Sequence, residues 1–406
     1  MKAIKHIVIL IKLILFSNFL LSQNNQLTPQ QKRTDFIYLH NILKENYPFF
    51  GVKFRTLNIN WLEQKDYYLE QLEKTENDSS YIVTLQKILK DLNDGHLNLS
   101  PTRYGGEGYR SAYYKMSKSY PRFYTWLHVF DENMSSIEYW ASILRKSEQS
   151  LLKDQRLNEE QSEYPETPNY TDTLLVSDNI AIMTIKSFNY HLEEEDHIKI
   201  DQFLKEIADS KALIIDIQEN SGGSETYWIK NIVQRLIKDS IQYIQYPIIK
   251  DGQLNRFFYS TFFNNAEPLE EGVYFSGLPS ELISERYFIK RTINTIYPKD
   301  PVKFDGKIFL LVSPKVFSAS EAFAQFCKST KWAIIAGEQT GGDGIGKDPA
   351  LIVLPESKIV IGYPSLVGLN NDGSINAEER TKPDIVLTEK TFNKRLNELI
   401  QLIKNN

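Results

Sequence analysis

This chain of 406 residues has a single cysteine, no excess of positive charge and only one long apolar run. The single cysteine, Cys327, cannot form an internal disulfide, so the fold must be held by burial, for which this length suffices. A net charge of −5 gives no reason to expect DNA or RNA as a partner, because nucleic-acid binders need clustered cationic surface. The sequence contains no phosphate-binding loop, dinucleotide fingerprint or paired-cysteine zinc spacing, and we expect no metal or organic cofactor.

The one long apolar run lies at the N-terminus. It extends from Ile7 to Leu21, follows two lysines and is interrupted by Lys12. The run is short for a membrane span and polar sequence follows it, so residues 1–22 are predicted to be a secretory signal peptide. An exported chain with one thiol fits the periplasm or cell envelope. A membrane is expected as a partner only if the signal stays uncleaved as an anchor, an alternative that Leu20, near the cleavage position, leaves open.

Aromatic residues, by contrast, are plentiful. Tyr, Phe and Trp make up 12% of the chain, and eleven of them fall within residues 101–140. Large flat side chains either fill a core or line a groove. This segment is therefore either a lid or groove wall beside a site, or ordinary core packing.

The rest of the chain changes from a helical sequence pattern to one that alternates strands and helices. Residues 23–100 carry apolar residues at helical spacing, such as Phe36, Leu39 and Leu43, and predict an N-terminal helical region. Residues 101–172 are an aromatic-rich helical and linker segment that ends in polar, proline-containing sequence. Residues 173–406 alternate short apolar runs with helical ones and predict an α/β core with a largely parallel sheet. Strands are expected at 180–185, 212–217, 307–312, 333–336 and 358–361, and helices at 198–207, 226–237 and 318–328.

A serine stands between a predicted buried strand and a predicted helix. Ser318 follows the strand at 307–312, where a nucleophile would be exposed at a helix start whose N–H groups can hold an oxyanion. Ser318 with Glu321 also fits a capping box, so a helix cap is the alternative. Gly222 and Gly223 follow the strand at 212–217, and their N–H groups either complete an oxyanion hole or belong to a tight turn.

Candidates for a general base and its partner lie far apart in the sequence. His96 follows an Asp-Gly turn and can act as a base near neutral pH, although an isolated histidine is also commonly structural. Glu378 and Glu379 precede a short strand, where either can orient a histidine or remain a solvated charge. The mostly acidic run between His191 and His197 is interpreted as solvated surface and not as a metal site.

Taken in order, these elements resemble the carboxyl-terminal processing peptidase superfamily, which includes tail-specific proteases, the tricorn core and interphotoreceptor retinoid-binding protein. The resemblance spans about residues 30–390. It implies a ClpP/crotonase-like spiral of ββα units after residue 173, and no PDZ module is expected before it. The blocks that carry the resemblance are Asp94-Gly95-His96, Asn220-Ser-Gly-Gly223, Ser318-Ala-Ser-Glu321, Gly337-Glu-Gln-Thr-Gly341 and Lys382-Pro-Asp384.

The resemblance implies an exported serine peptidase that acts on peptide or protein substrates. Ser318 falls on the family's nucleophile, His96 on the base, and Glu378 or Glu379 on the acid that orients the base in tricorn-like members; of the two, Glu378 is preferred. The N–H groups of Gly222 or Gly223 and of Ala319 would form the oxyanion hole. The alternative base is a lysine in tail-specific members. Here Asp343 takes that lysine's position and Lys347 is displaced by four residues, so the histidine scheme is preferred.

Three positions depart from the family pattern. Gln218 stands where many members have arginine, Gly95 where tricorn has serine, and Arg380 where a glycine usually precedes the Pro-Asp pair. Two rival functions follow from the same fold. One is a non-catalytic peptide- or lipid-binding protein with the aromatic segment as its binding wall. The other is crotonase-like acyl-CoA chemistry, for which the sequence shows no basic surface.

Overall fold

The computed structural model describes residues 26–103, 106–156, 168–346 and 348–405, which form two compact units. The helical unit comprises the described residues of 26–44, 59–156 and 351–363, and the sheet unit those of 45–58, 168–350 and 364–405. The predicted signal peptide lies outside the described residues. Within them, no helix combines the length and the apolar character that a membrane crossing requires.

The helical unit includes a short stretch from late in the sequence. The carboxylate of Asp35 in α2 accepts hydrogen bonds from the backbone N–H groups of Glu356 (2.7 Å) and Ser357 (3.0 Å), and the indole of Trp140 donates to Ser357 O (2.8 Å). Asp35, Trp140 and Ser357 are buried, so their pairing fixes the stretch in place. The elements of the unit are α2 (Pro29–Asn46), η1 (Trp61–Gln64), α4 (Lys65–Glu73), α5 (Asp78–Lys90), α6 (Ser100–Arg103), α7 (Gly106–Ser119), η2 (Pro121–Phe123), α8 (Tyr124–Arg156), β10 (Ala350–Val353) and β11 (Val360–Tyr363).

The aromatic segment forms part of this unit's core. Tyr113 of α7 packs against Phe123, Trp126 and Phe130, with ring centroids 5.6–6.0 Å apart, and all four side chains are buried. Helices occupy the described part of residues 106–156, as predicted. For these rings the core-packing alternative is confirmed.

The sheet unit alternates strands and helices along the chain. The helices of this unit are α3 (Phe50–Leu57), η3 (Tyr190–Leu192), α9 (Glu193–Glu206), α10 (Glu225–Trp228), η4 (Ile229–Val233), α11 (Gln234–Leu236), α12 (Gln253–Phe258), α13 (Ser260–Phe263), α14 (Ser280–Ser284), α15 (Ala319–Thr330), α16 (Asn376–Glu379) and α17 (Phe392–Lys404). The strands are β1 (Tyr170–Leu175), β2 (Ile180–Ile185), β3 (Ala212–Asp216), β4 (Ile241–Lys250), β5 (Glu267–Pro268), β6 (Tyr287–Ile289), β7 (Thr292–Ile296), β8 (Lys307–Val312), β9 (Ile334–Gly337), β12 (Leu366–Leu369) and β13 (Ile385–Val386).

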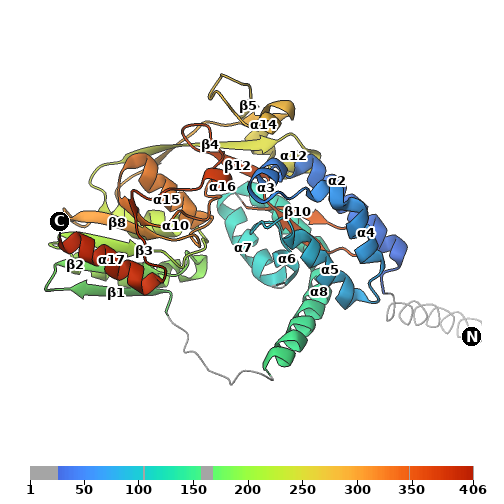
Figure 1. Ribbon diagram of the computed structural model, residues 1–406, viewed down its shortest axis with the longest axis horizontal. Helices are drawn as coiled ribbons and strands as arrows, with labels where there is room; N and C mark the ends of the chain where they lie inside the picture. Colours follow the sequence, from blue (N-terminus) through green and yellow to red (C-terminus); the bar gives the residue numbers. More distant parts are fainter. Residues whose placement is uncertain (1–25, 104–105, 157–167, 347, 406) are drawn as a thin grey trace, which may run out of the picture. The chain divides into compact units, whose positions relative to one another are not determined.

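Six strands form the main sheet in the order β1-β2-β3-β8-β9-β13, and all pairings except β1–β2 are parallel. Alternate side chains of each strand point to opposite faces. Ala181 and Met183 of β2 pack with α9, α10 and α15, whereas Ile180 and Ile182 pack with Leu399 of α17. Figure 1 shows α17 lying along one face of this sheet, with α10 and α15 beyond the other. A parallel sheet covered on both faces places its carboxyl ends, where ligands usually bind, at one edge.

A second sheet, β12-β4-β6-β5, has β7 paired to β4 and lies beside α15. The strand β4 is ten residues long and pairs with β7 along its first half and with β12 and β6 along its second half. Through β12 and α15 this sheet comes close to the loop that carries Glu378. It is therefore part of the surroundings of the candidate site.

The predicted α/β class with an N-terminal helical region is confirmed. The strands expected at 180–185 and 307–312 coincide with β2 and β8, and the three expected helices overlap α9, the run from α10 to α11, and α15. The sequence predicts that the chain passes from a helical region to an α/β core through the segment 101–172, and the two units of the structure depart from this division in two places. Residues 45–58 belong to the sheet unit, and residues 351–363 belong to the helical unit. Part of the expected linker, 157–167, lies outside the described residues.

Candidate functional site

Ser318 occupies a strained turn between β8 and α15. Its backbone has φ 58° and ψ −126°, a conformation that side-chain-bearing residues rarely adopt and that is often retained for function. Ser318 is the residue before the first turn of α15, but its side chain makes no capping hydrogen bond. The helix-cap interpretation is therefore wrong.

The turn that carries Gly222 lies directly against Ser318. Gly222 has φ 113°, and a Cβ added there would lie 2.8 Å from the Ser318 Cβ and 2.9 Å from the carbonyl oxygen of Phe317. Asn220 fixes this turn because its Oδ1 accepts hydrogen bonds from Gly222 N–H (3.0 Å) and from the Ser320 hydroxyl in α15 (2.6 Å). Asn220 is fully buried, so the two turns are held together by satisfied polar groups.

The two glycines differ in what their N–H groups contact. The N–H of Gly222, which was predicted to hold an oxyanion, already donates to Asn220. For Gly223 and Ala319, the described residues contain no acceptor for the backbone N–H. Because an oxyanion needs N–H groups that do not already donate elsewhere, this hydrogen bonding favours Gly223 over Gly222 as the donor that accompanies Ala319.

Glu321 is a residue of the site whose role the sequence did not reveal. It is fully buried, and its Oε1 accepts hydrogen bonds from Asn376 Nδ2 (2.9 Å) and from the Thr381 hydroxyl (2.6 Å). Burial raises the pKa of this carboxyl to about 7, although these hydrogen bonds act in the opposite direction. Glu321 thus anchors the loop of Glu378 to the helix that begins after Ser318.

The two candidate acids occupy different environments. Both oxygens of Glu378 in α16 accept hydrogen bonds from Arg55, at 2.9 Å from Nε and 2.7 Å from a terminal nitrogen. Arg55 lies in α3 and also pairs with Glu281 (2.5 Å). Glu379 instead pairs with Lys382 (2.8 Å) and is about half exposed. The bidentate contact fixes the Glu378 carboxylate, whereas the Glu379 carboxylate is held by one flexible lysine.

The remaining predicted residues are placed as follows. His96 lies in a turn of the helical unit, where its backbone N–H donates to Asp94 Oδ1 (2.9 Å). Ser318 and Glu378 belong to the sheet unit, so the meeting of His96 with them stays a prediction. Asp343, at the position of the lysine of tail-specific members, has φ 61°. The displaced Lys347 lies outside the described residues.

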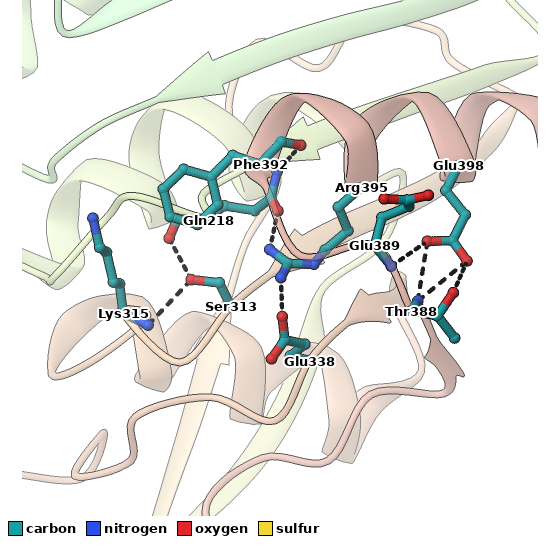
Figure 2. A network of polar contacts seen from close by, with 9 residues as sticks. All are labelled: Gln218, Ser313, Lys315, Glu338, Thr388, Glu389, Phe392, Arg395 and Glu398. Carbon is teal, nitrogen blue, oxygen red and sulfur yellow. Dashed lines mark hydrogen bonds and ion pairs between the residues drawn. The ribbon is translucent and has the colours of Figure 1, made fainter.

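An arginine from the C-terminal helix occupies the neighbourhood of Gln218. Figure 2 shows Arg395 of α17 between Gln218 and Glu338, donating to Gln218 Oε1 (2.6 Å) and pairing with the Glu338 carboxylate. Gln218 O in turn accepts a hydrogen bond from the Ser313 hydroxyl (2.5 Å), between the ends of β3 and β8. Gln218, which stands where the family pattern has arginine, is thus in contact with an arginine from elsewhere in the chain. Arg395 joins the segments after β3 and β9, and the Ser313 hydroxyl joins the segment that leads to Asn220 with the one that leads to Ser318.

Comparisons with known proteins bear on the family and on the fold. The model of peptidase family S41 matches residues 179–387. Among solved structures, a protein of Parabacteroides merdae ATCC 43184 described as a peptidase aligns with a TM-score of 0.55 and 18% identity over 94% of this chain and 97% of its own. Mature CPAF in complex with lactacystin aligns with a TM-score of 0.56 and 12% identity over 93% and 99%. At these identities the likeness shows the fold, and among curated proteins none matches the chain.

Proposed function

Since the chain belongs to peptidase family S41, we propose that it is an exported serine peptidase that cleaves peptide bonds with Ser318, His96 and Glu378. The observation that carries the proposal is Ser318 in its strained turn at the start of α15, where its side chain makes no capping hydrogen bond and the turn of Gly222 lies directly against it. A hydroxyl held at a helix start next to two N–H groups is the arrangement that acyl transfer requires.

In the proposed reaction, the Ser318 hydroxyl attacks the peptide carbonyl carbon while His96 takes the hydroxyl proton. The carbonyl oxygen becomes an oxyanion and accepts hydrogen bonds from Gly223 and Ala319 N–H. Collapse of this intermediate breaks the C–N bond, and His96 returns the proton to the leaving amine. Water then hydrolyses the acyl-enzyme by the same route.

Glu378 is proposed to orient the His96 ring. Its support is the contact with Arg55, which fixes both carboxylate oxygens yet leaves lone pairs for an imidazole N–H. Arg55 touches none of the reacting groups in this scheme and is a positioning residue. Glu379, paired with the exposed Lys382, lacks comparable restraint.

Hydrolysis of a labelled protein substrate tests the activity. The mature chain, residues 23–406, is incubated with fluorogenic casein beside Ser318→Ala and a matched control, Ser284→Ala, which changes an exposed serine of α14. We expect hydrolysis by the wild type and the control, and a loss of at least about 1,000-fold in Ser318→Ala. Equal hydrolysis by the wild type and Ser318→Ala would show that Ser318 is not the nucleophile.

Export is a separate part of the proposal and rests on residues 1–22. We expect the full chain, expressed in a bacterial host, to appear in the periplasmic or envelope fraction with its N-terminus at or near Gln23. Deleting residues 2–22 should keep it in the cytoplasm. A full-length chain that stays cytoplasmic with an intact N-terminus would contradict the signal-peptide prediction.

A further inference from the structure

A cavity of about 330 Å³ lies in the sheet unit on the side of α15 that faces β4. Its walls come from α15 (Ala322 to Ser329), from the middle of β4, from the loop after β12, and from residues 379–382. The volume is at the lower end of the range for small-ligand sites, enough for one or two amino-acid residues. No residue assigned to the proposed chemistry lines it, so the cavity has no role in the mechanism above.

The cavity is nonetheless close to the proposed nucleophile. Arg380 lines it, and the Arg380 side chain passes over Gly342, where an added Cβ would lie 3.2 Å from Arg380 Cγ. The carbonyl oxygen of Gly342 accepts the backbone N–H of Ser318 (3.3 Å). In space, Gly342 thus lies between the Arg380 side chain and the Ser318 turn and contacts both.

Among the described residues, the charges around the cavity give the exposed Arg380 no counter-ion. Lys328 pairs with Asp384 (2.5 Å), and Lys382 pairs with Glu379 (2.8 Å). The remaining lining carboxylate, Asp372, is turned into its own loop, where it accepts hydrogen bonds from the Ser374 N–H (3.0 Å) and hydroxyl (2.6 Å). Among the residues that the structure describes, none places a carboxylate within ion-pair distance of Arg380.

Arg380 also occupies a backbone conformation that suits glycine. It has φ 52° and ψ 179°, a region that is costly for any residue with a Cβ. A long cationic side chain at such a position, beside a cavity and one residue from Ser318, points to a use for the guanidinium that offsets this cost.

We propose that this cavity is a substrate subsite and that the Arg380 guanidinium receives a carboxylate of the bound peptide, an inference that rests on the proposed peptidase function. The carboxylate comes either from the peptide's C-terminus or from an Asp or Glu side chain. Arginine binds either through paired, charge-assisted hydrogen bonds.

The test measures binding and does not depend on catalysis. Three fluorescein-labelled decapeptides of otherwise identical Ala/Ser/Tyr sequence are titrated against the Ser318→Ala chain, with fluorescence anisotropy as the readout. The first peptide ends in a free carboxylate, the second in an amide, and the third in an amide with one central Glu. We expect at least one carboxylate peptide to bind about tenfold or more tightly than the neutral amide. A tighter free acid identifies the C-terminus as the source, and a tighter Glu peptide identifies the side chain.

The same titrations with Arg380→Gly and Arg380→Gln, each added to Ser318→Ala, test the named residue. Both changes should bring the carboxylate-to-amide ratio close to one, whereas Arg291→Gln, an exposed arginine outside the cavity, should leave the ratio unchanged. Arg380→Gly relieves backbone strain, so a loss of preference in that variant does not come from unfolding.

Equal binding of the three peptides, no measurable binding of any of them, or a preference that survives both Arg380 changes would overturn the subsite. Failure of the peptidase proposal has a different signature. In that case hydrolysis is missing from the wild type while the carboxylate preference of the Ser318→Ala chain is still lost on changing Arg380.

Discussion

Replacement of Arg380 by glycine should make the protein more stable, although most single substitutions destabilise. Its φ of 52° with ψ near 180° costs about 1–3 kcal/mol for a residue that carries a Cβ. Glycine removes this strain but adds unfolded-state entropy worth roughly 0.5–1 kcal/mol. The side chain has no ion pair among the described residues, so little opposes the gain. The net expectation is a stabilisation of about 0.5–2 kcal/mol.

Urea unfolding followed by intrinsic fluorescence measures this effect, with Arg380→Ala as the discriminating partner. Alanine removes the guanidinium but keeps the Cβ, so the difference between the Gly and Ala variants isolates the backbone term. We expect Gly to exceed Ala by about 1 kcal/mol or more, and Arg291→Gly, at a position with ordinary φ, to destabilise by roughly 0.5–1 kcal/mol. A Gly variant no more stable than the Ala variant would refute the strain argument.

Three further predictions follow from buried or paired charges. Because folding raises the pKa of Glu321 from 4.5 to about 7, this residue contributes about 3 kcal/mol to the free energy of unfolding below pH 4.5, and the contribution is lost as the pH rises through 7. Glu321→Gln should therefore flatten the dependence of the unfolding free energy on pH in that window. An unchanged profile would contradict the burial argument. Arg395→Met leaves Glu338 without its cation and Gln218 without a donor; because Glu338 is partly exposed and can be hydrated, the cost in urea unfolding should be about 1.5–3 kcal/mol, whereas a loss under 1 kcal/mol would mean that the pair is dispensable. Arg55→Met frees the carboxylate of Glu378 and should lower kcat by up to about 100-fold, with a shifted pH–rate profile and little change in KM; an unchanged kcat would remove Arg55 from the site.

The parts of the fold that sequence predicts are those in which a local pattern has only one structural outcome. Strands β2 and β8 are mainly apolar, most of their residues on both faces are buried, and both were predicted to the residue. The strand β4 was missed because its burial is irregular and Pro247 interrupts it, although pairing with three neighbours holds it extended. Residues 351–363 join the helical unit through hydrogen bonds to Asp35, more than 300 positions away, and no local pattern reports such a contact.

The candidate site likewise contains residues that the sequence predicts and residues that only the folded chain reveals. Ser318 and the paired glycines were found because short motifs mark them. The choice of Gly223 over Gly222 depends on the hydrogen bond from Gly222 to Asn220, which spacing alone does not show. Arg55 was missed because it meets Glu378 only through the folded chain. Arg380 was noticed as a departure from the family pattern, but its backbone conformation and the adjoining cavity appear only in three dimensions.

Covalent labelling by a fluorophosphonate tests the central proposal most directly, because the reagent reacts with a serine only when that serine is activated. The mature chain is labelled, digested and mapped by mass spectrometry beside Ser318→Ala, His96→Ala and the control Ser284→Ala. We predict a single adduct on Ser318 in the wild type and the control, and its loss in both site variants. Labelling that survives Ser318→Ala would contradict Ser318 as the nucleophile, and undiminished labelling in His96→Ala would contradict His96 as its base.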